Sequence, residues 1–321
     1  MKTKLFVILC CTLLNVFVFA QVKTKKDDTR KIVKHEKILT LRPAAGEKYS
    51  SPKWSPDAKM LAFSNQALNV IYLYSFKTKK VDVLVKEEGV GYKFQWSADG
   101  RFISYRGTIG SGKTRKQYLA YIDVTSKNIN KVGLEKSSYQ PPWWHYEGDA
   151  IYMAYLDDNQ IKHERVSKIA QNFINKLQNI TAVFMNNTLY FTDGYSLSKL
   201  TDENSFDPVF SPDKSSLFYS SLSGLFLYRI NKNETVKIGN YRSASWSPDG
   251  KYAVLQSSSD DGHVITGSEL LLFDIEKKLQ IPITEPKNEL EENPDLSACG
   301  TKICFNTMLT GEIVVIKIEN N

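Results

Sequence analysis

The stretch Trp246-Ser247-Pro248-Asp249-Gly250-Lys251 decides the fold, because close copies of it recur along the chain. The clear copies are Trp54-Ser55-Pro56-Asp57-Ala58-Lys59, Trp96-Ser97-Ala98-Asp99-Gly100-Arg101 and Phe210-Ser211-Pro212-Asp213-Lys214. Two degenerate copies are Trp144-His145-Tyr146-Glu147-Gly148-Asp149 and Leu296-Ser297-Ala298-Cys299-Gly300-Thr301. We call the first residue of each copy its anchor; it is aromatic or aliphatic, and consecutive anchors are 36 to 66 residues apart. Repeats of this size are typical of β-propellers, in which each repeat forms one blade.

Each copy predicts a β-hairpin. The anchor residue ends one strand, proline fixes φ in the turn, and aspartate accepts hydrogen bonds from the backbone that follows. A second strand comes next, as in 60–63 and 252–255. Third strands are predicted at 70–74, 118–122, 225–228 and 270–273, and fourth strands at 81–85 and 279–283. Four antiparallel strands make one blade, so the sequence predicts an all-β fold.

Six anchors favour a six-bladed propeller, and seven blades are the alternative. After the last anchor the chain supplies only two more strands, 302–305 and 313–318, so the preceding segment 37–41 is expected to add the missing outer strand and close the ring. The longest interval between anchors could hide a short seventh blade with Phe184 as a degenerate anchor. We interpret it instead as an insertion, 159–187, that projects from one rim ahead of strands 189–191 and 197–201.

The Trp-Ser-Pro-Asp-Gly unit, preceded by a strand ending in Leu200-Thr201 before Pro208-Val209-Phe210, resembles the propeller repeats of the TolB family. The resemblance covers roughly residues 37 to 319. It implies a propeller, but it says little about activity, because similar repeats occur in periplasmic scaffolds and in propellers attached to serine peptidases. TolB itself has an additional N-terminal α/β domain and the peptidase relatives a hydrolase domain, and we expect neither here.

The N-terminus is typical of a secretory signal. Lys2 and Lys4 precede an apolar run from Leu5 to Ala20, which is shorter than the roughly 20 residues of a membrane-spanning helix. We therefore expect a signal peptide over 1–20, a flexible leader over 21–36 and the propeller over 37–321. This predicts a periplasmic or extracellular protein without stable membrane insertion.

Two cysteines remain after the signal, so disulfides are not the main support of the fold. Cys299 and Cys304 flank a predicted hairpin turn. We interpret Cys304 as a small buried strand residue and Cys299 as a turn residue, with a local disulfide as the alternative.

Composition excludes some classes of protein. The chain has 321 residues with 42% hydrophobic and 12% aromatic residues, enough for a large core. Its formal net charge of +7 comes from scattered lysines and arginines interleaved with acids, so nucleic-acid binding is not expected.

Motifs for catalysis and cofactors are weak. The segment Gly107-Thr108-Ile109-Gly110-Ser111-Gly112-Lys113-Thr114 matches the phosphate-loop pattern, but a strand at 117–124 follows where a helix is needed. We interpret it as a loop between strands. No Gly-x-Ser-x-Gly elbow is present, and none of the four histidines pairs with another at metal-ligand spacing. We expect no cofactor, no metal site and no catalytic set.

A binding site is indicated four or five residues before each anchor, where the chain enters the innermost strand near one mouth of the channel. The residues there are Tyr49, Tyr92, Tyr139, Phe206, Tyr241 and Glu291. Aromatic side chains at a mouth could stack a sugar or grip a partner, and Trp143 is a further candidate. The alternative is that they pack between blades. The sequence thus predicts a non-catalytic binding module for an envelope or extracellular protein or a glycan. The alternative function is a lyase or hydrolase with a channel acid such as Glu291.

Overall fold

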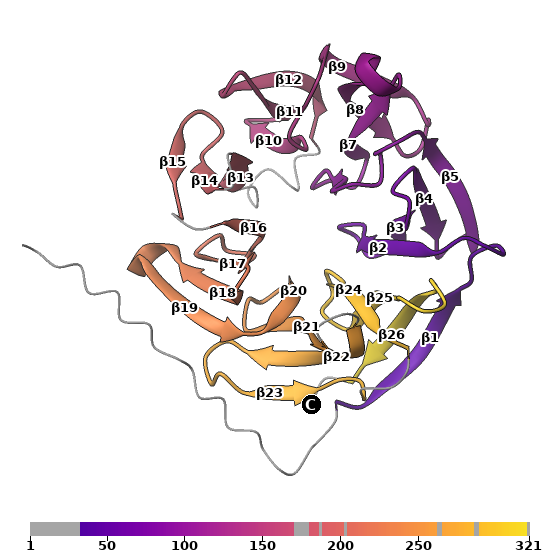
Figure 1. The fold of residues 1–321 in the computed structure, drawn as a ribbon, viewed down its shortest axis with the longest axis vertical. Coiled ribbons are helices and arrows are strands. Elements are labelled where there is room, and N and C mark those ends of the chain that lie inside the picture. The colour runs from indigo at the N-terminus through magenta and orange to yellow at the C-terminus, as the bar shows by residue number, and fades with distance from the viewer. Residues whose placement is uncertain are drawn as a thin grey trace, which may run out of the picture.

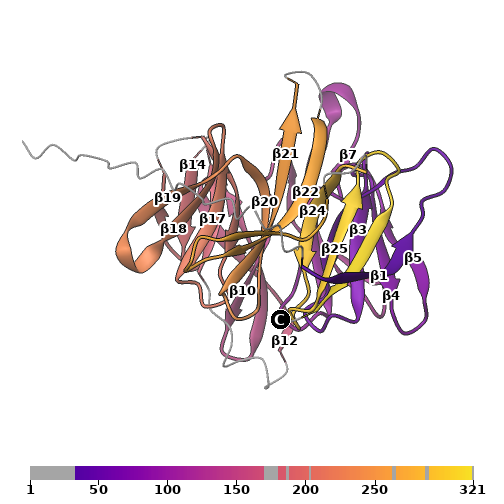
Figure 2. The same ribbon diagram turned by 90° about the horizontal axis from the view of Figure 1, so that it is seen from below.

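The computed structural model describes residues 33–169, 180–185, 188–201, 204–261, 265–285 and 289–319. They form seven antiparallel sheets arranged as a ring around a central channel, and Figure 1 looks along this channel. Figure 2 shows the ring from its edge, with the sheets standing side by side. The predicted all-β propeller is confirmed. The six-blade count was wrong, and the seven-bladed alternative is correct.

Six blades, 1 to 6, are built along consecutive stretches of chain and have their innermost strand first; blade 4 is described separately below. Blade 1 contains β2 (Tyr49–Trp54), β3 (Met60–Asn65), β4 (Val70–Ser75) and β5 (Lys80–Lys86). Blade 2 contains β6 (Gln95–Trp96), β7 (Phe102–Ile109), the short 3-10 helix η1 (Gly112–Thr114), β8 (Lys116–Asp123) and β9 (Ile129–Lys136). Blade 3 contains β10 (Trp143–Glu147), β11 (Ala150–Asp157) and β12 (Gln160–Lys168). Blade 5 contains β16 (Ser205–Phe210), β17 (Ser216–Ser221), β18 (Gly224–Arg229), η2 (Ile230–Lys232) and β19 (Glu234–Gly239). Blade 6 contains β20 (Tyr241–Trp246), β21 (Tyr252–Asp260), β22 (Ile265–Asp274) and β23 (Gln280–Pro282).

Blade 4 is the unit that the six-blade interpretation missed. It contains β13 (Thr181–Met185), β14 (Thr188–Thr192) and β15 (Leu197–Lys199), with Phe184 in the innermost strand. The start of the predicted insertion, 160–168, is β12 and pairs with β11 as the outer strand of blade 3. The insertion is therefore wrong over this range: the segment completes one blade and then begins the next.

Blade 7 closes the ring. It contains β24 (Glu291–Leu296), β25 (Lys302–Thr307), β26 (Ile313–Ile318) and, from the other end of the chain, β1 (His35–Leu41). The pairing of β1 with β26 confirms the predicted closure, and it covers an edge that would otherwise remain open. Val33 is buried against this blade, two residues before β1 begins. The predicted signal peptide lies outside the described residues. Within the described part of the chain, no helix is long and apolar enough to cross a membrane.

The repeated turn has the hydrogen bonding that its sequence implies. In the first copy the Ser55 hydroxyl donates to the Asp57 carboxylate at 2.7 Å, and the same serine oxygen accepts the backbone N–H of Met60 at 2.9 Å. Equivalent Ser-to-Asp bonds measure 2.7 Å at Ser97, 2.6 Å at Ser211 and 2.6 Å at Ser247. In blade 7, Cys299 takes the place of the aspartate, with its sulfur 3.2 Å from Ser297 Oγ. Cys299 and Cys304 are both free, Cys304 buried and Cys299 exposed, as interpreted from the sequence.

The anchor tryptophans hold neighbouring blades together. Each indole N–H donates to the carbonyl oxygen of the residue just before the anchor of the preceding blade. The four bonds are Trp54 to Asp295 at 3.1 Å, Trp96 to Lys53 at 3.4 Å, Trp144 to Gln95 at 3.0 Å and Trp246 to Val209 at 2.9 Å. The anchors Phe184, Phe210 and Leu296 have no N–H to donate. The repeat therefore encodes contacts between blades as well as turns within them.

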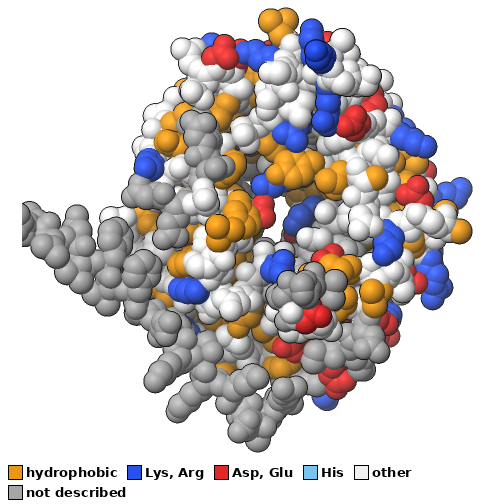
Figure 3. Space-filling view, in the orientation of Figure 1, with side chains coloured by type: hydrophobic (Ala, Val, Ile, Leu, Met, Phe, Trp, Pro, Cys, Tyr) orange, Lys and Arg blue, Asp and Glu red, His pale blue; other side chains and the backbone are white. Residues whose placement is uncertain are grey.

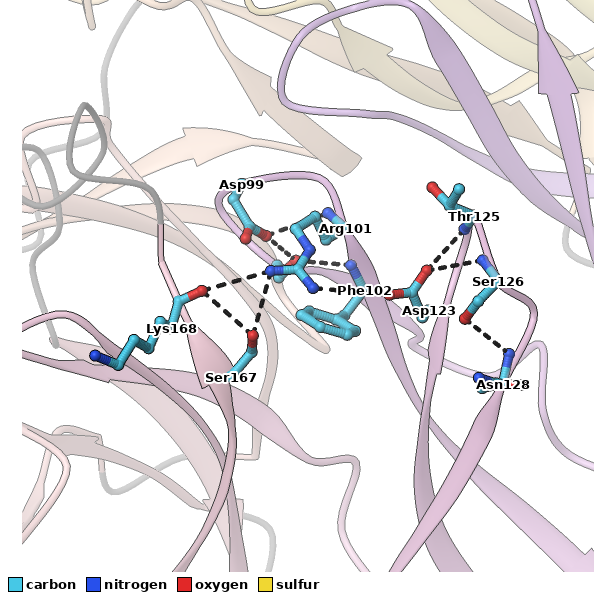
Figure 4. A network of polar contacts seen from close by, with 10 residues as sticks. Asp99, Arg101, Phe102, Asp123, Thr125, Ser126, Asn128, Ser167 and Lys168 are labelled. Carbon is cyan, nitrogen blue, oxygen red and sulfur yellow. Dashed lines mark hydrogen bonds and ion pairs between the residues drawn. The ribbon is translucent and has the colours of Figure 1, made fainter.

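Arg101 adds a polar link between blades 2 and 3, shown in Figure 4. Its guanidinium donates to Ser167 Oγ at 3.2 Å and to the Lys168 carbonyl at 3.5 Å, and it lies 3.8 Å from the Asp123 carboxylate. The same guanidinium stacks on the Phe102 ring at 4.8 Å. The residue after the Asp-Gly turn thus contributes to the packing of the ring.

Candidate functional site: one mouth of the channel

The two faces of the ring differ in the connections they carry. The innermost strands all begin on one face, which we name the mouth face. It also carries the turns between the second and third strands of each blade, including 110–115, 193–196, 222–223 and 308–312. The Ser-Pro-Asp turns lie on the opposite face. The predicted site residues belong to the mouth face, because they precede the anchors.

A repeated bulge shapes this mouth. The residue three positions before the anchor has a left-handed backbone in four blades: Ser51 (φ 53°), Lys93 (φ 52°), Asp207 (φ 51°) and Asn293 (φ 52°). The register with the second strand shifts at this point in β2, β16 and β24. Non-glycine residues are uncommon in this conformation, and a bulge redirects side chains. The bulge recurs at the same position of the repeat, so the repeat itself determines the shape of the mouth.

Position relative to the anchor decides where each predicted aromatic residue points. The residues five positions before the anchor pack into the protein. Tyr139 is buried, Tyr49 packs edge-on against Phe63 with ring centroids 4.7 Å apart, and Tyr241 packs against the core between blades 5 and 6. Burial raises the pKa of Tyr241 to about 12. Tyr139 and Tyr241 thus pack between neighbouring blades, whereas the cited contact of Tyr49 is with Phe63 of its own blade.

The residues four positions before the anchor are on the surface instead. Tyr92 and Phe206 each remain 37% exposed. The Tyr92 ring lies 5.0 Å from the Arg106 guanidinium and 5.5 Å from the Lys93 ammonium. Phe206 lies in β16 one position nearer to its anchor than Tyr49 in β2 and Tyr241 in β20, and successive side chains of a strand point to opposite faces. These two aromatic side chains are available to a ligand.

Lys93 and Asp207 form an ion pair that joins opposite sides of the channel. Lys93 Nζ lies 2.8 Å from Asp207 Oδ1, although the residues belong to blades 2 and 5. Both side chains keep partial contact with solvent, with 38% and 49% exposed. Burial lowers the pKa of Lys93, but Asp207 outweighs this and the net shift is upward. Figure 3 shows charged and hydrophobic side chains around the central opening.

A second ion pair lies deeper in the wall. Lys53 Nζ is 3.2 Å from Asp295 Oδ1, and the other carboxylate oxygen accepts the Trp54 backbone N–H at 2.8 Å. Burial lowers the pKa of Lys53, but Asp295, and to a smaller extent Asp207, raise it further than burial lowers it. The ammonium of Lys53 therefore stays charged and ties blade 7 to blade 1.

The other two candidates are not on the surface. Trp143 is 4% exposed and packs against Val183 of blade 4. Glu291 is 8% exposed, and Thr284 donates its hydroxyl to the Glu291 carboxylate. Burial raises the pKa of Glu291 to about 7, so this carboxyl is a structural group of the blade 6–7 region.

The phosphate-loop-like segment is a connection between strands. Its residues end β7 and form η1, and β8 follows in register with β7. The predicted strand after the loop is confirmed. A 3-10 helix of three residues has no extended row of backbone amides for phosphate.

Exposed apolar side chains are distributed unequally over the described residues. On the mouth face they are Tyr92, Ile180, Tyr195, Phe206, Leu222 and Leu309. The others, Ile38, Val81, Val83, Ile129 and Leu134, lie on the outermost strands at the rim. Among the described residues none lies in a Ser-Pro-Asp turn of the opposite face. Leu222 is 88% exposed at the tip of its turn.

Solved structures with the same fold include two informative neighbours. A chain in the crystal structure of the mitotic checkpoint complex superposes with a TM-score of 0.61 at 14% identity, over 89% of this chain and 95% of that one. TolB from Acinetobacter baumannii superposes with a TM-score of 0.50 at 16% identity, over 78% of this chain and 57% of TolB. This chain has a TolB-like propeller fold. It spans little more than half of the TolB chain, and at these identities the likeness concerns the fold. No family model and no curated protein matches the sequence.

Sequence reasoning missed the charged part of the mouth. Lys93 and Asp207 are 114 residues apart in the sequence, and neither was among the predicted site residues. The signal that could have found them is their shared position three residues before an anchor, where the repeat otherwise has Ser51 and Asn293.

Proposed function

We propose that this protein is a non-catalytic binding module that engages a protein partner through the mouth face of its propeller. The observation that carries the proposal is the distribution of exposed apolar side chains: among the described residues, those away from the rim all lie on that face. Aromatic side chains near the centre of an interface are typical of residues that dominate protein binding. The proposed partner is a periplasmic or extracellular protein, in keeping with the predicted signal peptide.

The mouth combines anchoring and orienting groups. Tyr92 and Phe206 flank the channel from blades 2 and 5, the same blades that supply Lys93 and Asp207. An apolar side chain of the partner would bury both rings, while the ion pair would orient charged groups beside it. A glycan is the alternative ligand, since the same rings can stack a sugar. The acid named for the alternative of turnover in the channel, Glu291, is buried.

The test is capture from an extract of the source's envelope with residues 21–321, first at low and then at high salt. The mouth variant carries Tyr92→Ser and Phe206→Ser, and the matched rim variant carries Val83→Ser and Leu134→Ser. We expect wild type and rim variant to retain the same protein at both salt concentrations, and the mouth variant to lose it. Equal capture by both variants, or no protein retained by wild type at high salt, would refute the proposal.

A further inference from the structure

The mouth face carries a polar pocket over blade 1 that the proposed binding surface does not use. Its volume is about 430 Å³, within the range of about 300–1,000 Å³ that is typical of pockets for small ligands and single side chains. Two segments of chain line it: residues 46–48, which lead into β2, and residues 65–67 with Asn69, which form the turn between β3 and β4.

Hydrogen bonds to the backbone hold both walls of this pocket in place. The Gln66 N–H donates to the Lys48 carbonyl at 2.8 Å, which ties one wall to the other. The Asn65 carbonyl accepts the Leu68 N–H at 2.9 Å and the Ser50 hydroxyl at 3.0 Å, which closes the turn on β2. The walls are therefore part of the folded blade and do not need a ligand to form.

The side chain of Asn65 arranges the acceptor groups of the pocket. Asn65 is 4% exposed, and its Nδ2 donates to Glu47 Oε2 at 3.2 Å and to Asn69 Oδ1 at 2.8 Å. The Oδ1 of Asn65 accepts the Asn69 backbone N–H at 3.1 Å, which fixes the orientation of the amide. Because one nitrogen donates to both oxygens, the Glu47 and Asn69 acceptors lie at most about 6 Å apart.

These acceptors keep capacity for a further donor. A carboxylate or amide oxygen can accept two hydrogen bonds, and Glu47 Oε2 and Asn69 Oδ1 each receive one from Asn65. Among the described residues, the second carboxylate oxygen of Glu47 has no hydrogen-bond partner at all. The pocket therefore offers several unused acceptor positions within a few ångströms of each other.

The negative charge of Glu47 is not neutralised by the chain. Lys48 and Arg42 are the basic residues nearest to it in the sequence, and both are engaged with blade 7, which lies beside blade 1 (Figure 1). Lys48 Nζ donates to the Met308 carbonyl at 3.0 Å, and Arg42 forms an ion pair with Glu312 at 3.0 Å. Glu47 has no ion pair within the described residues. An unpaired carboxylate beside further acceptors favours a cationic donor as the ligand and disfavours an anion.

We propose that this pocket binds the guanidinium group of an arginine side chain that the partner presents to blade 1. This rests on the proposed function, since it names one group of the protein that the mouth face engages. A guanidinium is planar and always charged, and its five N–H donors can reach the Glu47 carboxylate and the Asn69 amide oxygen together. Leu309 follows Met308, the residue that accepts from Lys48, and is 53% exposed, so an apolar side chain of the mouth face adjoins the pocket.

The test is an NMR titration of isotope-labelled protein, residues 21–321, with Nα-acetyl-arginine amide up to about 20 mM. We expect saturable binding with a dissociation constant of about 1 mM, as for a ligand of this size, and amide shifts centred on the pocket. Nα-acetyl-citrulline amide has nearly the same shape but no charge, and it should bind at least about tenfold more weakly.

Variants of the pocket test the assigned acceptors. Glu47→Gln should weaken binding of the arginine compound by at least about tenfold, and Asn69→Ala by about fivefold. Glu276→Gln is the matched control, because it removes an exposed carboxylate outside the pocket, and it should bind as the wild type does. Glu47 is exposed and Asn69 partly exposed, so both variants should fold, which circular dichroism checks.

Absence of saturable binding by the wild type, or equal binding of the arginine and citrulline compounds, would overturn the proposal without any variant. Wild-type affinity in Glu47→Gln, or an equal loss in Glu276→Gln, would overturn it as well. The titration contains no partner protein, whereas the capture experiment tests Tyr92 and Phe206, which lie outside this pocket. Failure of this proposal and failure of the proposed function are therefore distinguishable.

Discussion

Replacing Trp246 by phenylalanine tests whether the indole bonds between blades stabilise the ring. Trp246 is 9% exposed and donates to the Val209 carbonyl at 2.9 Å, so Trp246→Phe removes this bond and leaves a carbonyl without its donor. Trp143 is the natural comparison. It is 4% exposed, but among the described residues its indole N–H has no acceptor. Trp143→Phe therefore removes an unmet donor from the interior.

The magnitude follows from the difference between the two variants. Both replace an indole by a phenyl ring at a buried position, so the cost of the lost volume largely cancels. Trp246→Phe loses a net hydrogen-bond contribution of about 1 kcal/mol, and Trp143→Phe regains at least about 1 kcal/mol of desolvation cost. Trp246→Phe should therefore be less stable than Trp143→Phe by about 2 kcal/mol. With an unfolding entropy of about 2.1 cal/mol/K per residue, that corresponds to roughly 3 °C in melting temperature for a propeller of this size.

The assay is thermal and guanidinium unfolding followed by far-ultraviolet circular dichroism. The wild type, both single variants and the double variant are compared at one pH. Melting temperatures of the two single variants that agree within about 1 °C would refute the argument, because the hydrogen bond would then contribute nothing measurable. A larger loss for Trp143→Phe would refute it more strongly.

Two further predictions concern ionisable groups with shifted pKa values. Partial burial raises the pKa of Cys299, but hydrogen bonds with Ser297 and Thr301 outweigh this effect and bring the pKa to about 7. The rate at which Cys299 is alkylated in the native protein should therefore rise as the pH passes through 7, while Cys304 should not react. A midpoint near that of free cysteine, about 8.5, would contradict this prediction. Burial raises the pKa of Glu291 from 4.5 to about 7, so its contribution to stability is complete below pH 4.5 and is lost as the pH rises through 7. The Glu291→Gln variant should be about as stable as the wild type at pH 5. At pH 8 its free energy of unfolding should be higher than that of the wild type by on the order of 3 kcal/mol. An equal difference at both pH values would contradict the raised pKa of Glu291.

The architecture was largely predictable because the turn chemistry is local. Proline, aspartate and the serine hydroxyl fix each Ser-Pro-Asp turn within six residues, so the hairpins could be placed from the sequence. Closure by β1 was predictable for a different reason, since the last blade lacks a strand and the first segment has no blade. Both predictions depend on residues that are close together in the chain or on a simple count of strands.

Blade 4 was not predictable from the same motif. In blade 1 the segment 55–59 separates the first two strands, whereas β13 ends at Met185 and β14 begins at Thr188, which leaves room for two residues only. A search for the Ser-Pro-Asp turn therefore passes over Phe184. The exposed residues of the mouth were predicted only in part. The bulge before each anchor sets which side chain faces the channel, whereas the prediction treated the positions four and five residues before the anchor as equivalent.

The indole bonds are not spread evenly around the ring. They join blade 7 to blade 1, 1 to 2, 2 to 3 and 5 to 6, whereas none of them reaches blade 4, whose anchor is Phe184 and whose neighbour has Phe210. The ends of the described chain meet at the closure, where the Glu319 N–H donates to the Lys34 carbonyl at 3.0 Å. A circular permutant that joins these ends and starts anew within blade 4 would keep every indole bond inside one uninterrupted run of blades. A permutant cut between blades 1 and 2 would divide that run at its centre.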